Sequence, residues 1–173
     1  MQQRQNLKVL LTVTLLVAME IVLNRFLSIN TPILKIGFGF VPLAITGMLF
    51  GPKWGFIAGA MADFIGASLF PIGAYFPGFT LSVALRGMNF GLFLHKRKNN
   101  WFNLILVVLI NNILIGLLLT SFWLHIITGT AFLALVKVRV IQFAILIPVQ
   151  FIVLRVMQHP VNVHLKKQFA FDH

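Results

Sequence analysis

The fold is decided by residues 63–86, DFIGASLFPIGAYFPGFTLSVALR, which set Asp63 and Arg86 in apolar sequence on either side of a turn. The turn, 70–78, is rich in proline, glycine and aromatic residues, and proline and glycine interrupt helices. The stretch therefore predicts two membrane helices joined as a hairpin. Irregular backbone at bilayer depth is tolerated only where it is buried or lines a cavity, so we expect the turn to be shaped to bind a ligand.

Composition places the whole chain in a membrane. Of its 173 residues, 59% are hydrophobic and 10% are charged, and the mean hydropathy is +0.95, which excludes a soluble monomer. A bilayer crossing needs roughly 20 apolar residues. Six stretches are candidate spans: 7–27, 38–51, 54–71, 77–95, 101–123 and 135–157. We expect a single domain, residues 1–173, folded as an all-α bundle of six transmembrane helices, with 28–37 as an outer loop.

The distribution of lysine and arginine predicts the orientation, because cytoplasmic loops carry the excess of positive charge. With the N-terminus inside, cytoplasmic segments hold nine of the fourteen basic residues, namely Arg4, Lys8, Lys53, Lys96, Arg97, Lys98, Arg155, Lys166 and Lys167. We therefore expect both termini in the cytoplasm. Topology and attraction to the anionic lipid bilayer explain the net charge of +11 better than a nucleic-acid partner does.

The charges inside the spans carry the most chemical meaning, because an unpaired charge near mid-bilayer costs at least about 2.5 kcal/mol. Asp63 and Arg86 are equally far from the middle of the turn, so they would lie at the same depth on antiparallel helices. We expect a structural ion pair between them, or an arrangement in which one of them also reaches a bound ligand. Glu20 lies at similar depth on the first span, and the sequence assigns it no partner.

Aromatic residues and cations gather toward the outer face. Phe70, Tyr75, Phe76 and Phe79 crowd the turn, where Pro77 and Gly78 fix an irregular path, and such rings suit a flat aromatic ligand. The outer ends of the spans supply cations and one amide: Arg25, Lys35, Lys137, Arg139 and Gln142. These cations could equally serve as interfacial anchors. Read together, the two groups indicate an anion with an aromatic head.

Small residues at helical spacing predict close packing of helices. Gly55, Gly59, Ala62 and Gly66 lie along the third span, where packing within the bundle is the default interpretation. Thr14 and Ala18 form a similar pair on the first span, where contact with another subunit is an equal alternative.

Catalysis has little support in the sequence. The five histidines show no HExxH pattern, no serine lies in a nucleophile elbow, and no glycine-rich loop is present to hold phosphates. The chain has only three acidic residues and no cysteine, which leaves few ligands for a metal. We therefore expect no enzyme activity, no catalytic residue, no metal and no cofactor in this chain.

Three segments carry a resemblance to a known family: 23–32 (LNRFLSINTP), 35–42 (KIGFGFVP) and 70–82 (FPIGAYFPGFTLS). They resemble the substrate-binding S components of energy-coupling-factor (ECF) vitamin transporters, and among these the folate-binding members. The resemblance implies a multi-pass protein of the bacterial cell membrane that captures folate at the outer face. It also implies partners, namely a transmembrane coupling subunit and two ATPase subunits that hydrolyse ATP.

The resemblance also suggests roles for particular residues. In the family, a small-xxx-small motif on the first helix contacts the coupling subunit; Thr14 and Ala18 fit it here, with Ala18 and Val22 as a poorer alternative. The pterin of folate would then lie among the aromatic residues of the turn, Phe70, Tyr75, Phe76 and Phe79. Its carboxylates would lie near Arg25, Lys137 and Arg139, with Arg86 as a polar contact at the floor. The alternatives are an S component for another vitamin and a ligand-free membrane scaffold protein.

Overall fold

The computed structural model describes residues 2–30, 35–71, 73, 75–95 and 101–161. Its elements are α1 (Gln2–Arg25), β1 (Ser28–Asn30), β2 (Lys35–Gly37), α2 (Phe40–Phe50), α3 (Pro52–Leu69), α4 (Pro77–Leu94), α5 (Trp101–Leu109), the π-helix η1 (Ile110–Leu119), α6 (Thr120–Thr128) and α7 (Phe132–Pro160). Because α5, η1 and α6 are continuous, the described chain forms six helical rods. Among the described residues, three helical segments are long and apolar enough to cross a membrane: Asn6–Arg25, Trp101–Thr128 and Phe132–Gln158.

Proline and glycine set the helix boundaries much as the sequence suggested. Pro52 and Pro77 stand at the starts of α3 and α4, where the missing N–H leaves no hydrogen bond unmade. Gly51 joins α2 to α3 with a φ of 89°, which a residue with a side chain adopts only with strain. The segment 28–37, expected as a loop, instead contains an antiparallel hairpin in which Ser28 lies opposite Gly37.

Glycines bring the backbones of α3 and α4 into contact. A Cβ on Gly55 would collide with the carbonyl of Gly87, and a Cβ on Gly87 would collide with the carbonyl of Gly55. One turn along, a Cβ on Gly59 would lie 2.6 Å from the carbonyl oxygen of Val83. The expectation that the small residues of the third span pack within the bundle is confirmed.

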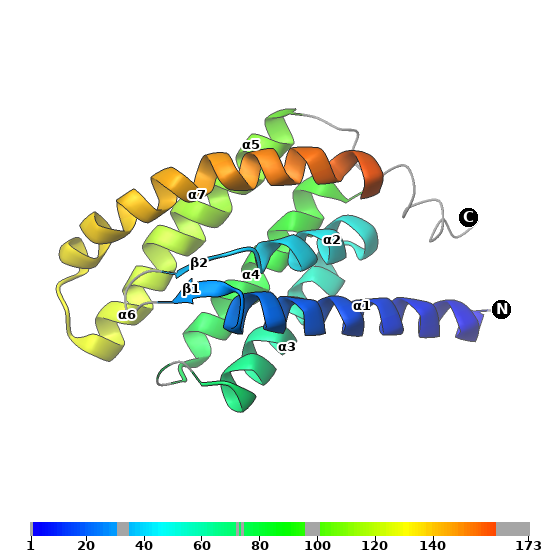
Figure 1. Cartoon of the computed structure of the whole chain (residues 1–173), viewed down its shortest axis with the longest axis horizontal. Helices are drawn as coiled ribbons and strands as arrows, with labels where there is room; N and C mark the ends of the chain where they lie inside the picture. The colour runs from blue at the N-terminus through cyan, green and yellow to red at the C-terminus, as the bar shows by residue number, and fades with distance from the viewer. Residues whose placement is uncertain (1, 31–34, 72, 74, 96–100, 162–173) are drawn as a thin grey trace.

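The two ends of the bundle are built differently (Figure 1). The end of α1, the β1–β2 hairpin, the α3–α4 turn and the α6–α7 connection lie together, and the N-terminus of α1 lies at the opposite end. The apolar core fills the region toward the second end, with Leu43, Met48, Phe90, Leu104 and Leu154 almost completely buried. The end that carries the β1–β2 hairpin and the α3–α4 turn, by contrast, contains a cavity, and we call it the hollow end.

Candidate ligand-binding site

A cavity of about 620 Å³ lies in the hollow end, bounded by residues of α1, α2, α3, α4, η1, α6 and α7. This volume falls within the range of roughly 300–1,000 Å³ that is usual for small-molecule sites. Seven of the predicted site residues line it: Arg25, Tyr75, Phe76, Phe79, Arg86, Arg139 and Gln142. The cavity therefore unites residues that are more than one hundred positions apart in the sequence.

Four predicted site residues lie outside the cavity lining: Phe70, Pro77, Gly78 and Lys137. Phe70 packs edge-on against Phe26, with ring centroids 5.0 Å apart. Lys137 is exposed, whereas Arg139 is buried, because residues two apart on an α-helix point in nearly opposite directions. The side chain of Lys35, also expected among the outer cations, is outside the described part of the chain.

Aromatic rings form one wall of the cavity and are held by a hydrogen bond. Phe76 contacts Phe79 at 6.2 Å and Trp123 at 5.6 Å between ring centroids. The indole Nε1 of Trp123 donates to Ser82 Oγ at 3.2 Å, and that hydroxyl donates to the carbonyl of Gly78 at 3.0 Å. Gly78 therefore supports the aromatic wall. A Cβ at this position would lie 2.6 Å from the ring of Phe76 and 2.6 Å from the ring of Trp123, so only glycine fits there.

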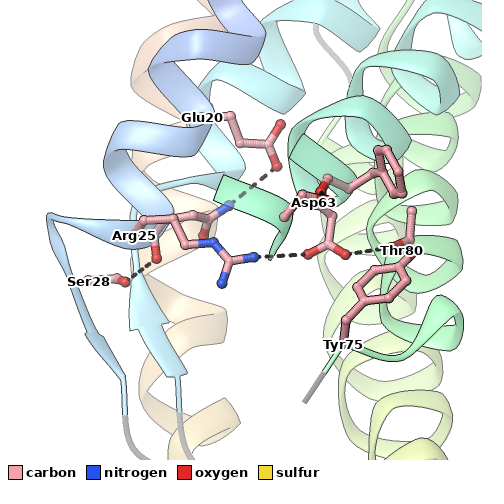
Figure 2. Close-up of polar contacts among 9 residues, drawn as sticks. Glu20, Arg25, Ser28, Asp63, Tyr75 and Thr80 are labelled. Atoms are coloured by element: carbon pink, nitrogen blue, oxygen red, sulfur yellow. Dashed lines mark hydrogen bonds and ion pairs between the residues drawn. The ribbon is translucent and has the colours of Figure 1, made fainter. Parts of the chain in front are cut away.

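The predicted ion pair between Asp63 and Arg86 is wrong, because Asp63 pairs with Arg25 of α1 (Figure 2). Arg25 Nη2 lies 3.9 Å from Asp63 Oδ1. Equal depth on two helices fixes the height of a side chain but not the direction in which it points. Gly66, one turn beyond Asp63, leaves the room that Arg25 occupies, since a Cβ there would lie 3.0 Å from Arg25 Nε.

Asp63 is also linked by hydrogen bonds, through Thr80 of α4, to Tyr75 of the α3–α4 turn. Its Oδ2 accepts a hydrogen bond from Thr80 Oγ1 at 2.8 Å, and Thr80 Oγ1 lies 3.2 Å from the hydroxyl of Tyr75. A threonine hydroxyl has one hydrogen, so Tyr75 must donate to Thr80. Figure 2 shows the resulting chain of contacts from α1 through α3 and α4 to the turn.

Two arginines line the cavity from different helices, the half-buried Arg86 of α4 and the buried Arg139 of α7. Arg139 is 5% exposed and its Nη1 donates to Ser121 Oγ at 3.2 Å. Arg86 Nη2 lies against Gly116, 3.1 Å from where a Cβ would stand. In the described structure, the Nε atoms of both arginines are buried without a hydrogen-bond partner. Because an unsatisfied buried donor is costly, this region is suited to a ligand that carries negative charge or hydrogen-bond acceptors.

Buried amides lie beside the arginines, and sequence reasoning missed them. Asn111 accepts a hydrogen bond from Asn89 Nδ2 at 3.2 Å, and Asn112 Nδ2 donates to Gln150 Oε1 at 2.8 Å. Asn111, Asn112 and Gln150 all line the cavity. Two adjacent asparagines inside an apolar span were the available signal, because polar residues at bilayer depth are expensive and usually functional. Both lie in η1, and π-helical turns occur frequently at functional sites.

Glu20 also lines the cavity and is 2% exposed. Its Oε1 accepts a hydrogen bond from Asn24 Nδ2 at 3.4 Å, one turn along α1 (Figure 2). The carboxylate of Glu20 and the Arg25–Asp63 pair therefore occupy the same side of the site (Figure 2).

The three residues predicted to meet a partner lie on the outside of α1. Thr14, Ala18 and Val22 are all exposed, and the hydroxyl of Thr14 is held by the carbonyl of Leu10 at 2.9 Å. Their neighbours Leu11 and Leu15 are exposed by 61% and 63%. This face of α1 is therefore apolar and uncovered by the rest of the described chain.

Comparison with known proteins decides the family. The model of the "ECF transporter, substrate-specific component" family matches residues 8–157. The chain belongs to the ECF S component family. It is accordingly a multi-pass membrane protein and a substrate-specific component rather than an enzyme.

Similar proteins extend over most of this S component. It is 41% identical over 150 residues to the "Folate transporter FolT" of Clostridium novyi (strain NT), covering 87% of each chain. It is 32% identical over 142 residues to a protein of the same name from Leuconostoc mesenteroides subsp. mesenteroides, covering 79% of this chain and 76% of the relative. A crystal structure of FolT bound with folic acid superposes with a TM-score of 0.78 at 39% identity, covering 83% of this chain and 86% of the other.

Proposed function

We propose that this S component binds folate in the cavity at the hollow end of the bundle. The observation that carries the proposal is the combination of a fixed aromatic wall with two arginines whose Nε donors are buried and have no partner in the described structure. Folate has the matching chemistry, a flat pterin and a glutamate tail with two carboxylates. The similarity to proteins named folate transporters, over most of the chain, supports the same ligand.

In the proposed arrangement the pterin lies against Phe76 and Phe79, close to Tyr75. The tail carboxylates meet Arg139 and Arg86, because their buried and unpaired Nε donors make an anionic partner most valuable. Arg25 is a weaker candidate for binding the glutamate tail than the sequence suggested, because it already forms an ion pair with Asp63. Lys137 and Phe70 take no part, since both lie outside the lining.

The proposal extends to topology and partners. Six spans with both termini in the cytoplasm place the hollow end at the outer face, in agreement with the distribution of lysine and arginine. The chain carries no cofactor of its own, and ATP is used by two ATPase subunits that act through a coupling subunit. The exposed face at Thr14, Ala18 and Val22 supports contact with that coupling subunit, because small residues allow helix backbones to approach closely.

Calorimetric titration of the detergent-purified chain with folate tests the proposal. We expect saturable binding at one site, with no comparable heat from thiamin, riboflavin or biotin. Trp123 reports on the site independently, because its ring packs against Phe76 of the cavity lining: folate should quench its fluorescence, and Trp123→Phe should remove most of the quenching. Saturable binding of another vitamin with no folate binding would assign the S component to that vitamin. Binding of none of them would overturn the proposal.

A further inference from the structure

A second cavity, of about 410 Å³, is a groove between α5 and α7, at the level where α5 passes into η1. On α5 it is lined by Ile105, Val108 and Leu109, and on α7 by the turn that contains Pro148 and Phe151. Every residue that lines it is apolar. Val108 is 1% exposed and forms the floor, whereas Ile105 is 43% exposed at the rim. The groove therefore opens toward the surroundings of the bundle.

An aromatic and cationic group stands at one end of this groove. Phe151, which lines the groove, contacts the ring of Trp101 with centroids 5.7 Å apart. The guanidinium of Arg155 stacks over the same Trp101 ring, with its Cζ 4.5 Å from the ring centroid. Arginine and tryptophan are favoured at the membrane–water interface. The end of the groove is therefore at headgroup level if the chain spans the bilayer as proposed.

The guanidinium can stack and bind an anion at the same time. Stacking uses the face of the planar group, whereas its N–H donors point outward in the plane and form two parallel bonds to a phosphate. The sequence adds Lys96, Arg97 and Lys98 just before Trp101. Positive charge at the interface attracts anionic lipid.

We propose that the groove holds an acyl chain of an anionic phospholipid of the bilayer, with the phosphate of the lipid against Arg155. Trp101 and Arg155 each lie one turn from groove residues on their own helices, so a chain that leaves a headgroup at Arg155 would enter the groove directly. The groove is also separate from the predicted partner face. α7 packs mainly on α5, η1 and α6, with smaller contacts to α2 and β2, whereas α1 packs mainly on α2 and α3. Figure 1 shows α1 and α7 on different sides of the bundle.

Native mass spectrometry of the full chain released from nanodiscs tests this site. The probes are phosphatidylglycerol and phosphatidylcholine with identical acyl chains. We expect phosphatidylglycerol to be retained preferentially, by about fivefold, the effect of one arginine at an anionic surface. Millimolar inorganic phosphate should not displace it, because the acyl chain contributes to binding. Displacement by phosphate would indicate a simple anion site and overturn the proposal, as would equal retention of the two lipids.

Variants separate the headgroup contact from the chain contact. Arg155→Gln should lower retention of phosphatidylglycerol to that of phosphatidylcholine, whereas Lys53→Gln, an exposed cation on α3, should leave the preference unchanged. Ile105→Trp should fill the groove and lower retention of both lipids, whereas Ile145→Trp, exposed on α7 outside the groove, should not. Monodisperse elution and an unchanged melting temperature establish that each variant is folded. Wild-type retention in Arg155→Gln or in Ile105→Trp would overturn the proposal, and loss of the lipid on assembly with the coupling subunit would assign the groove to that partner instead.

Discussion

Arg25 at the end of α1 and Asp63 in the middle of α3 form an ion pair across the wall of the ligand cavity, with 3.9 Å between Nη2 and Oδ1. The two side chains are 11% and 15% exposed. Asp63 is held from the other side by Thr80, so the pair connects α1 to α4 as well as to α3. This connection gives Asp63 a structural role that its position in the hairpin alone did not reveal.

A double-mutant cycle measures this pair. Arg25→Gln and Asp63→Asn should each lower the free energy of unfolding in detergent by about 1–3 kcal/mol, because each leaves a largely buried charge without its partner. The double variant should lose clearly less than the sum of the two losses. The matched cycle of Asp63→Asn with Arg86→Gln should show weaker coupling. Strictly additive losses for Arg25 and Asp63 would contradict the pairing.

Gly116 leaves room for the ring of Phe143 and the guanidinium of Arg86 at the cavity. A Cβ there would lie 2.7 Å from the ring of Phe143 and 3.1 Å from Arg86 Nη2. Gly116→Ala should therefore lower folate affinity by about 5- to 150-fold, if the overpacking cost of about 1–3 kcal/mol falls on the ligand-bound state. Leu114→Ala, on the exposed side of the same π-helix, is the control and should bind as the wild type does. Equal affinities of Gly116→Ala and wild type in a calorimetric titration would show that the ligand does not need Arg86 in this position.

Arg139 and Lys137 lie two residues apart, one buried in the cavity lining and one exposed, and together they test which cation contacts the glutamate tail of folate. Arg139→Gln should weaken folate binding by about 10- to 150-fold, the equivalent of one charge-assisted contact of about 1.5–3 kcal/mol. Lys137→Gln should have no effect, because Lys137 is exposed outside the cavity. Pteroate, which lacks the glutamate, should bind wild type and Arg139→Gln with similar affinity. An equal loss for folate and pteroate would place another part of the ligand at Arg139.

Close packing of α3 on α4 can be tested without touching the ligand. Gly87→Ala adds a methyl group that would collide with the carbonyl of Gly55, and it should cost about 1–3 kcal/mol of stability. Gly73→Ala is the control, since a Cβ there meets nothing within 4 Å. Thermal unfolding in detergent distinguishes the two, and an unchanged melting temperature for Gly87→Ala would show that the helices separate easily.

Binding and transport should separate at α1. Ala18→Trp places a bulky side chain on the exposed face and should block close approach of a partner helix. Folate binding by the isolated chain should survive, whereas uptake in cells that carry the coupling and ATPase subunits should fall sharply, together with co-purification of those subunits. Ile141→Trp, at a position on α7 that is also exposed, should allow uptake. Loss of folate binding in Ala18→Trp with intact assembly would place this face of α1 in the pocket.

Much of the fold was predictable, because helix boundaries depend on local sequence. The predicted span 77–95 corresponds to α4, Pro77–Leu94, and the predicted 54–71 corresponds to α3, Pro52–Leu69. Proline at the start of each of these two helices, and Pro71 just after α3, are local signals. The π-helix and the β1–β2 hairpin were missed, since the first extends an ordinary apolar run and the second consists of two strands of three residues each.

The sequence by itself determined the membrane character of the chain, most helix boundaries and the aromatic character of the α3–α4 turn, because these depend on composition and on residues close together in the chain. Tertiary structure alone decided that Asp63 meets Arg25 rather than Arg86, and that Asn111 and Asn112 share a cavity with Arg139. Depth in the bilayer follows from counting residues, but the direction of a side chain depends on which helix packs beside it. That choice rests on contacts between distant segments, such as Gly55 with Gly87 and Gly66 with Arg25.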